Sequence, residues 1–163
     1  MTGDGRPAGG STLEHATVVE IDRRGVLIRG PSGSGKTALA IELLFRCRAC
    51  DIESALVADD YVYLAGGEET GTLVASAPER TAGLIEFRGF GIVKAGYARH
   101  KPKTRVGLSV LLAAPADCDR VADPGRRAVF FGVALPELAL PEREPISNAY
   151  AVLGCLGLSE RVF

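Results

Sequence analysis

The main signal in this chain is Gly30-Pro31-Ser32-Gly33-Ser34-Gly35-Lys36-Thr37. It fits the pattern G-x-x-x-x-G-K-[ST], in which glycines let backbone amides close around a phosphate group. Successive N–H groups form an anion-binding nest, and the positive end of the following helix adds to it. Lys36 supplies a full charge for the β- and γ-phosphates, and the Thr37 hydroxyl can ligate Mg²⁺. The sequence therefore predicts that residues 30–37 bind the phosphates of a nucleotide.

The sequence around this loop predicts two strands before it, and a helix and then a strand after it. Residues 16–21 (ATVVEI) and 25–28 (GVLI) are β-branched and apolar, which predicts two strands before the loop. Residues 37–49 place apolar side chains near helical spacing, and residues 55–58 (ALVA) are a continuous apolar run typical of a strand buried on both faces. This order predicts an α/β fold, in which a mixed β-sheet carries the phosphate loop and is flanked by helices.

Weaker signals continue along the chain. Residues 61–64 and 72–76 flank a glycine-rich turn, which predicts a hairpin. Residues 84–87 and 106–114 read as further strands, and residues 148–158 as a short helix. The last third of the chain is otherwise rich in proline, arginine and glutamate, and its pattern gives only weak predictions of secondary structure. So many β-rich segments in the middle of the chain argue against a purely parallel sheet.

Length and composition exclude several classes of protein. A chain of 163 residues suits one domain, which we expect at residues 12–163 after a disordered, glycine-rich tail at residues 1–11. The net charge of -1 gives no global attraction to nucleic acid or to an anionic membrane. Neither a signal peptide nor an apolar run of about 18 residues is visible, so we expect a cytoplasmic protein. Cys47 and Cys50 have C-x-x-C spacing, but no second pair completes a zinc site, and we read them as ordinary thiols.

Carboxylates follow the apolar run 55–58. Asp59 and Asp60 close it, and functional side chains gather at the carboxyl ends of strands in open α/β sheets. A carboxylate there can hold Mg²⁺ or accept the proton of an attacking hydroxyl, and neighbours on a strand point in different directions, so we expect different roles for the two. Glu86, beside Arg88 in an apolar strand, is either one half of an ion pair or a metal ligand.

Four blocks of sequence together resemble one family. They are His15 placed 15 residues before Gly30, the loop at 30–37, the block Val57-Ala58-Asp59-Asp60, and Leu84-Ile85-Glu86-Phe87-Arg88-Gly89-Phe90-Gly91-Ile92. In order and spacing, residues 15–91 resemble the catalytic domain of the HPr kinase/phosphorylase family. The last block is similar to that family's E-I-R-G-x-G-I signature, with Phe87 replacing Ile. The resemblance implies a PEP-carboxykinase-like P-loop domain, in which ATP phosphorylates a serine of an HPr-type phosphocarrier protein.

The resemblance also implies roles for individual residues. Lys36 would bind the β- and γ-phosphates, and His15 would support the active site. Asp60 would act as the base toward the serine hydroxyl and, in the reverse direction, would protonate the leaving serine oxygen. The metal ligands would be Thr37, Glu86 and, from its place at the end of a strand, Asp59. A catalytic arginine is expected after Glu86, and Arg120 is favoured over Arg126 and Arg127.

Departures from the family pattern leave alternatives open. The chain resembles the short, single-domain proteobacterial form, so we expect it to lack the N-terminal domain of the long members. The family's R-P-G-R-N segment, tied to phosphorolysis by inorganic phosphate, is replaced by LPEREPISN at residues 140–148, which leaves that activity open.

The family is often hexameric, which implies a homo-oligomer. The basic run 94–105 is either a docking site or a solvated loop. Alternative functions are a P-loop kinase or NTPase with another acceptor and a non-catalytic nucleotide-binding regulator.

Overall fold

The apolar runs around the phosphate loop form the middle of a curved sheet in the computed structural model, which describes residues 10–95 and 99–162. The central strands are β2 (Thr17–Ile21), β3 (Arg24–Arg29) and β4 (Ser54–Ala58), and β2 lies between the other two, antiparallel to both. Alternate side chains enter two different cores, Val19 on one face and Val18 on the other. Burial on both faces explains why these strands are continuous apolar runs.

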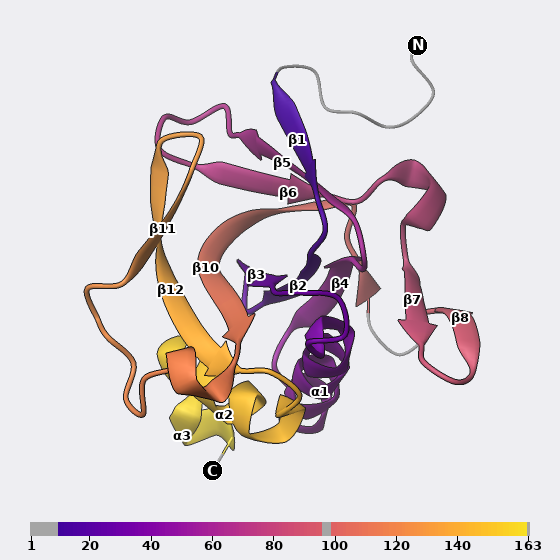
Figure 1. The fold of residues 1–163 in the computed structure, drawn as a ribbon. Coiled ribbons are helices and arrows are strands. Elements are labelled where there is room, and N and C mark those ends of the chain that lie inside the picture. Colours follow the sequence, from indigo (N-terminus) through magenta and orange to yellow (C-terminus); the bar gives the residue numbers. More distant parts are fainter. Residues whose placement is uncertain (1–9, 96–98, 163) are drawn as a thin grey trace.

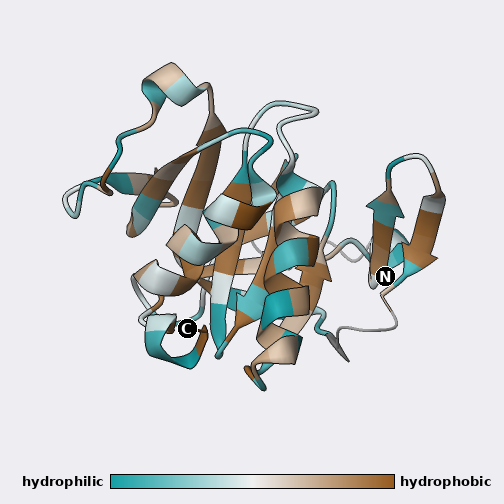
Figure 2. Cartoon of the chain, turned by 90° about the horizontal axis from the view of Figure 1, so that it is seen from below, coloured by the Kyte–Doolittle hydropathy of each residue, from teal (hydrophilic) through white to brown (hydrophobic). Residues whose placement is uncertain are grey.

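Helices cover one face of these strands (Figure 1). α1 (Lys36–Ala49) follows the loop directly, and α2 (Pro145–Cys155) and α3 (Ser159–Val162) close the chain. Leu39 and Leu43 of α1 pack with Val152 of α2 against the sheet. Figure 2 shows hydrophilic and hydrophobic residues following one another along α1. Within residues 10–95 and 99–162, none of the helices is both long and apolar enough to cross a membrane.

The second core lies under a layer of antiparallel strands. β5 (Val62–Gly66) pairs with β6 (Leu73–Ser76) on one side and with β1 (Ser11–Glu14) on the other. The long, bent β10 (Lys103–Ala113) joins the two layers, because its first residues pair antiparallel with β6 and the rest run parallel to β3 (Figure 1). The short β9 (Arg99–His100) runs parallel to β4. The expected mixed sheet is confirmed.

The last third of the chain holds strands that the sequence did not predict. After a short 3₁₀ turn, η2 (Pro115–Asp117), β11 (Arg127–Phe130) pairs antiparallel with β12 (Val133–Pro141), and β12 runs parallel to β10. Glu137 of β12 is buried, and its carboxylate accepts hydrogen bonds from Arg29 and Arg126. Arg29 is the last residue of β3, so this cluster ties β12 to the strand that enters the phosphate loop.

Other predicted elements agree with the structure to within a few residues. The hairpin predicted from residues 61–64 and 72–76 is β5 and β6, and the strand at 84–87 is β7 (Leu84–Phe87). β7 follows the 3₁₀ turn η1 (Glu79–Thr81) and pairs with β8 (Gly91–Lys94) in a separate two-stranded sheet. α2 starts earlier than predicted, because Pro145 is well accommodated in a first helical turn. β1 starts within the predicted tail, and residues 1–9 lie outside the described part.

Candidate active site

The phosphate loop joins the end of β3 to the start of α1, as the motif requires. Gly30 has φ 151° and Gly35, which precedes α1, has φ 97°, both in the region that favours glycine. A Cβ at Gly30 would lie 2.7 Å from Ser34 Oγ and 2.8 Å from the Leu112 carbonyl oxygen. The Ser34 hydroxyl itself is buried and has no hydrogen-bond partner among the described residues. The backbone therefore forms a tight cradle with an unused polar group in its wall.

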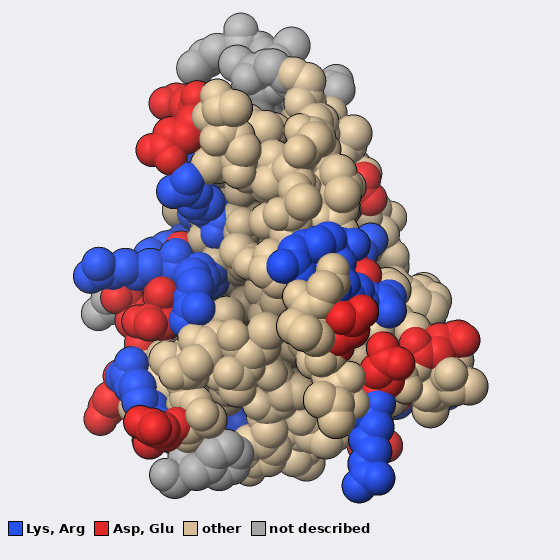
Figure 3. Space-filling model, turned by 90° about the vertical axis from the view of Figure 1, so that its left-hand side faces the viewer, with Lys and Arg blue, Asp and Glu red and all other residues tan. Residues whose placement is uncertain are grey.

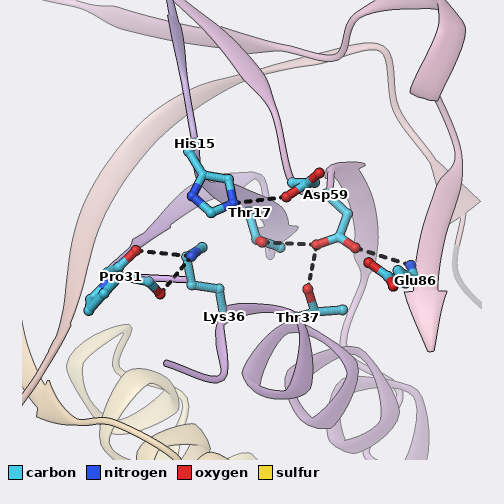
Figure 4. Close-up of polar contacts among 9 residues, drawn as sticks. His15, Thr17, Pro31, Lys36, Thr37, Asp59 and Glu86 are labelled. Atoms are coloured by element: carbon cyan, nitrogen blue, oxygen red, sulfur yellow. Dashed lines mark hydrogen bonds and ion pairs between the residues drawn. The ribbon is translucent and has the colours of Figure 1, made fainter. Parts of the chain in front are cut away.

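Lys36 lies folded over this loop. Its side chain is only 6% exposed, and Nζ donates hydrogen bonds to the carbonyl oxygens of Gly30 at 2.9 Å and Pro31 at 3.1 Å (Figure 4). Burial lowers the pKa of the Lys36 ammonium, and the negative charges of Asp60 and Asp59 oppose that shift. The ammonium is thus held above the loop by weak acceptors that a phosphate oxygen can replace.

Asp59 is the point where three elements meet. Its carboxylate is 4% exposed and accepts hydrogen bonds from the hydroxyls of Thr17 on β2, at 2.9 Å, and Thr37 on α1, at 2.8 Å. The other oxygen accepts the backbone N–H of Glu86 on β7 at 3.2 Å (Figure 4). Three donors offset the cost of burying this charge. Asp59 therefore fixes the position of the Thr37 hydroxyl relative to β7.

Asp60 points away from Asp59 because of a strained turn. The N–H of Tyr61 bonds to the Asp59 carbonyl at 2.9 Å, and Asp60 between them has φ 72°, a rare form of γ-turn. The exposed Asp60 carboxylate lies 2.8 Å from Nε2 of His15, whose ring packs near that of Tyr61. Strain of this kind concentrates at functional sites. The two neighbouring aspartates thus have different surroundings, because Asp59 is buried and Asp60 is open to solvent.

The loop and the carboxylates share one cleft of about 470 Å³. Its walls include His15, Lys36, Thr37, Asp60, Glu86 and Arg88. Of the residues predicted for chemistry, the structure brings together His15, Lys36, Thr37, Asp60 and Glu86 here, with Asp59 directly behind them. Glu86 is exposed to the cleft, and no ion pair joins it to Arg88 in the part of the chain that is described. This favours the metal-ligand interpretation of Glu86.

The predicted arginine lies elsewhere. Arg120 is exposed in the segment between η2 and β11 and is not among the described residues that line the cleft. Arg126 bonds to Glu137 at 3.0 Å, and Arg127 donates to the carbonyl of Pro124. None of these three arginines is among the described residues that line the cleft.

Two further residues reach the site without a local sequence signal. Thr17 lines the cleft and holds Asp59 from 42 positions away. The backbone N–H of Arg143 donates to the Ser34 carbonyl at 2.9 Å, and its guanidinium donates to the Gly33 carbonyl at 3.4 Å. Arg143 belongs to the segment 140–148 that departs from the family pattern, yet it lies directly against the loop. Neither contact is visible in a motif, because both join distant parts of the chain.

The basic run 94–105 is used in part for internal ion pairs. The Lys101 ammonium pairs with Glu20 and lies 3.9 Å from Glu53, while the Arg105 guanidinium lies 2.7 Å from Glu69. On the face that carries β11 and β12, Lys and Arg likewise alternate with Asp and Glu (Figure 3). Residues 96–98 of the run lie outside the described residues. Two of the described cations of this run, Lys101 and Arg105, therefore already have carboxylate partners within the chain.

A strand, a glycine loop that caps a helix, and carboxylates at the end of a nearby strand define a P-loop domain of the α/β class. A family model described as the HPr Serine kinase C-terminal domain matches residues 9–152. The chain belongs to this family.

Relatives support the assignment. The HPr kinase/phosphorylase of Limosilactobacillus reuteri is 34% identical over 134 residues, which are 78% of this chain and 40% of that protein. The HPr kinase/phosphorylase of Geobacillus thermodenitrificans is 34% identical over 140 residues, 82% of this chain and 43% of that protein. The chain thus spans about two fifths of the length of these relatives. A solved structure, the Hpr(Ser) kinase/phosphatase from Coxiella burnetii, superposes with a TM-score of 0.72 at 26% identity and covers 91% of this chain and 98% of that chain.

Proposed function

We propose that this domain transfers the γ-phosphoryl group of ATP to a serine hydroxyl of an HPr-type phosphocarrier protein. The observation that carries the proposal is that Asp60, exposed and paired with His15, shares one cleft with the phosphate loop and Lys36. The names of its relatives supply the acceptor. A cytoplasmic location belongs to the same proposal, since all four cysteines are free thiols.

The hydrogen-bond donors of the loop suit the phosphate groups of ATP. Backbone N–H groups at the start of α1 and the Lys36 ammonium suit the β- and γ-phosphates, and the unpartnered Ser34 hydroxyl supports the presence of a polar ligand. Binding would replace the contacts from Lys36 to the carbonyls of Gly30 and Pro31. Because a hydrogen bond from an ammonium to a charged phosphate oxygen is stronger than one to a neutral carbonyl, this exchange is favourable.

Mg²⁺ also fits the donor set. The hydroxyl of Thr37 and the carboxylates of Asp59 and Glu86 are the hard oxygen ligands that this ion prefers. The described residues hold no cluster of three His, Cys, Asp or Glu side chains, which agrees with an ion held by one or two carboxylates, waters and substrate phosphates. When bound, the ion would neutralise charge that develops on the phosphates.

Asp60 carries the proton in the transfer step. As the serine oxygen forms its bond to the γ-phosphorus, the carboxylate of Asp60 accepts the hydroxyl proton, and the bond between the γ-phosphorus and the β–γ bridging oxygen breaks to release ADP. His15 orients Asp60 through the 2.8 Å contact. In the reverse direction, Asp60 would return the proton to the serine oxygen as inorganic phosphate takes the phosphoryl group and leaves as pyrophosphate.

The test is phosphoryl transfer from ATP with Mg²⁺ to a purified HPr-type protein. We expect the acceptor to gain one phosphate on a serine, found by intact mass and peptide mapping, and we expect none on an acceptor in which that serine is alanine. A second arm adds inorganic phosphate to the product and measures release of pyrophosphate. ATP turnover with no transfer to the serine would contradict the proposed acceptor and favour a P-loop kinase or NTPase with another one.

A further inference from the structure

The hairpin β7–β8 stands apart from the body of the molecule and is unusually apolar for an exposed element (Figures 1 and 2). It forms its own two-stranded sheet. Phe90 at its tip is 80% exposed and Ile92 on β8 is 70% exposed, with Phe87 39% exposed. A soluble protein that exposes large apolar side chains together on one element usually binds a partner there.

One face of this hairpin is continuous with the cleft. In the register of the two strands Glu86 lies opposite Ile92, and opposite residues of an antiparallel pair project to the same side. Glu86 lines the cleft, so Ile92 extends its rim. The neighbouring pair, Ile85 and Val93, projects to the other side and packs on the core. The exposed side chain of Ile92 therefore lies along the mouth of the site, and Phe87 lines the cleft itself.

The tip of the hairpin is held in one shape. The N–H of Phe90 bonds to the Phe87 carbonyl at 2.9 Å, which closes a turn across Arg88 and Gly89. Gly89 has φ 86° and Gly91 has φ 126°, conformations that glycine adopts readily. The base of β7 is tied to the catalytic region by the bond from the Glu86 N–H to Asp59. A fixed turn presents Phe90 to solvent, and the anchor keeps the hairpin beside Asp60.

We propose that the β7–β8 hairpin docks the protein acceptor, with Phe90 and Ile92 seated on an apolar patch beside the acceptor serine. This inference rests on the proposed function. A serine on a folded protein reaches Asp60 only if the surface around that serine lies on the cleft mouth, and the hairpin forms one rim of that mouth. Arg88 lines the cleft and Lys94 ends β8, so an acidic group near the patch would add to the fit.

The experiment compares Phe90→Ala, Ile92→Ala and the double variant with Phe45→Ala. Phe45 is 70% exposed on α1, is not among the described cleft residues, and serves as the matched control. Steady-state transfer to an HPr-type protein gives KM and kcat for the acceptor and KM for ATP, and titration calorimetry measures acceptor binding without turnover. We expect the double variant to raise the acceptor KM and Kd by about tenfold or more, with kcat and the KM for ATP unchanged.

The outcomes separate this inference from the proposed function. If the wild type transfers phosphate and the double variant binds the acceptor within about twofold of the Phe45→Ala control, the docking role is overturned and the kinase stands. Hairpin-dependent binding of the acceptor without any transfer would support docking and overturn the kinase. If light scattering shows that the double variant loses a dimer or higher oligomer while acceptor binding is unchanged, the hairpin contacts a second copy of this chain, and the docking role is again overturned.

Discussion

Burying a carboxylate is costly unless donors match its oxygens, and Asp59 has three of them from three different elements. This arrangement gives the neighbouring residues Asp59 and Asp60 different environments. Asp59 is a fixed acceptor that holds the Thr37 hydroxyl and the start of the hairpin, whereas Asp60 is turned outward by a strained γ-turn. The positive φ of Asp60 turns its carboxylate toward His15, in the cleft that also holds the phosphate loop.

Thr17 provides a test of this arrangement. Thr17→Val keeps the shape of the side chain but removes a donor from Asp59, so we expect the free energy of unfolding to fall by about 1–3 kcal/mol. Because Asp59 also orients Thr37, the Mg²⁺ concentration at half-maximal transfer should rise. Thr17→Ser keeps the hydroxyl and should restore the wild-type dependence on Mg²⁺. Equal Mg²⁺ profiles for the valine and serine variants would contradict a positioning role, whatever their stabilities.

At the scale of elements, α1 joins the site to the core. Its first residues form the floor of the cleft, and its inner face buries Leu39, Leu43 and Cys47 against the sheet. Cys47 is 0% exposed, and burial, with a smaller effect of Cys50, raises the pKa of its thiol to about 11. A thiol with a raised pKa is a poor nucleophile at neutral pH. This agrees with the interpretation of the C-x-x-C pair as ordinary thiols.

The buried thiol predicts a loss of stability at high pH. The unfolded Cys47 ionises near its ordinary value of 9.0, but the folded one near about 11, so between these values the unfolded state binds fewer protons. Stability is full below pH 9 and falls as the pH rises, by about 2–3 kcal/mol in total. Urea unfolding from pH 8 to pH 11 measures the slope in wild type and in Cys47→Ala. The alanine variant should lose less stability over this range, and parallel curves would contradict the assignment.

At the scale of the whole molecule, the sequence predicted the parts whose signals are local. The phosphate loop, α1 and the strands on either side are adjacent in the chain, and each has its own periodicity or motif. β12 was missed because Pro136 interrupts its pattern. The pairing of β12 with β11 extends to Pro136, and its pairing with β10 starts at Glu137. The proline therefore lies between the two pairings, where a missing N–H is tolerated.

The sequence likewise predicted some residues of the candidate site and missed others. His15, Lys36, Thr37, Asp60 and Glu86 were named in advance and line one cleft. Thr17 and Arg143 were not, because their contacts join residues that are 42 and 109 or more positions apart. The position of a catalytic arginine was expected from spacing alone. In the structure, Arg120 lies in the segment between η2 and β11, where it is exposed and is not among the described residues that line the cleft.

The central claim is that Asp60 removes the proton from the acceptor serine beside the phosphate loop. The most direct measurement is the single-turnover rate of phosphoryl transfer from ATP to an HPr-type protein, for wild type, Asp60→Asn and Asp51→Asn. Asp51 at the end of α1 is the matched control, because it is exposed like Asp60 and also has a positive φ, 52°. Asparagine tolerates this backbone conformation as well. We expect a rate about 100- to 10,000-fold lower for Asp60→Asn, with unchanged ATP affinity and a normal rate for Asp51→Asn. A rate for Asp60→Asn within a few-fold of the wild type would contradict this claim.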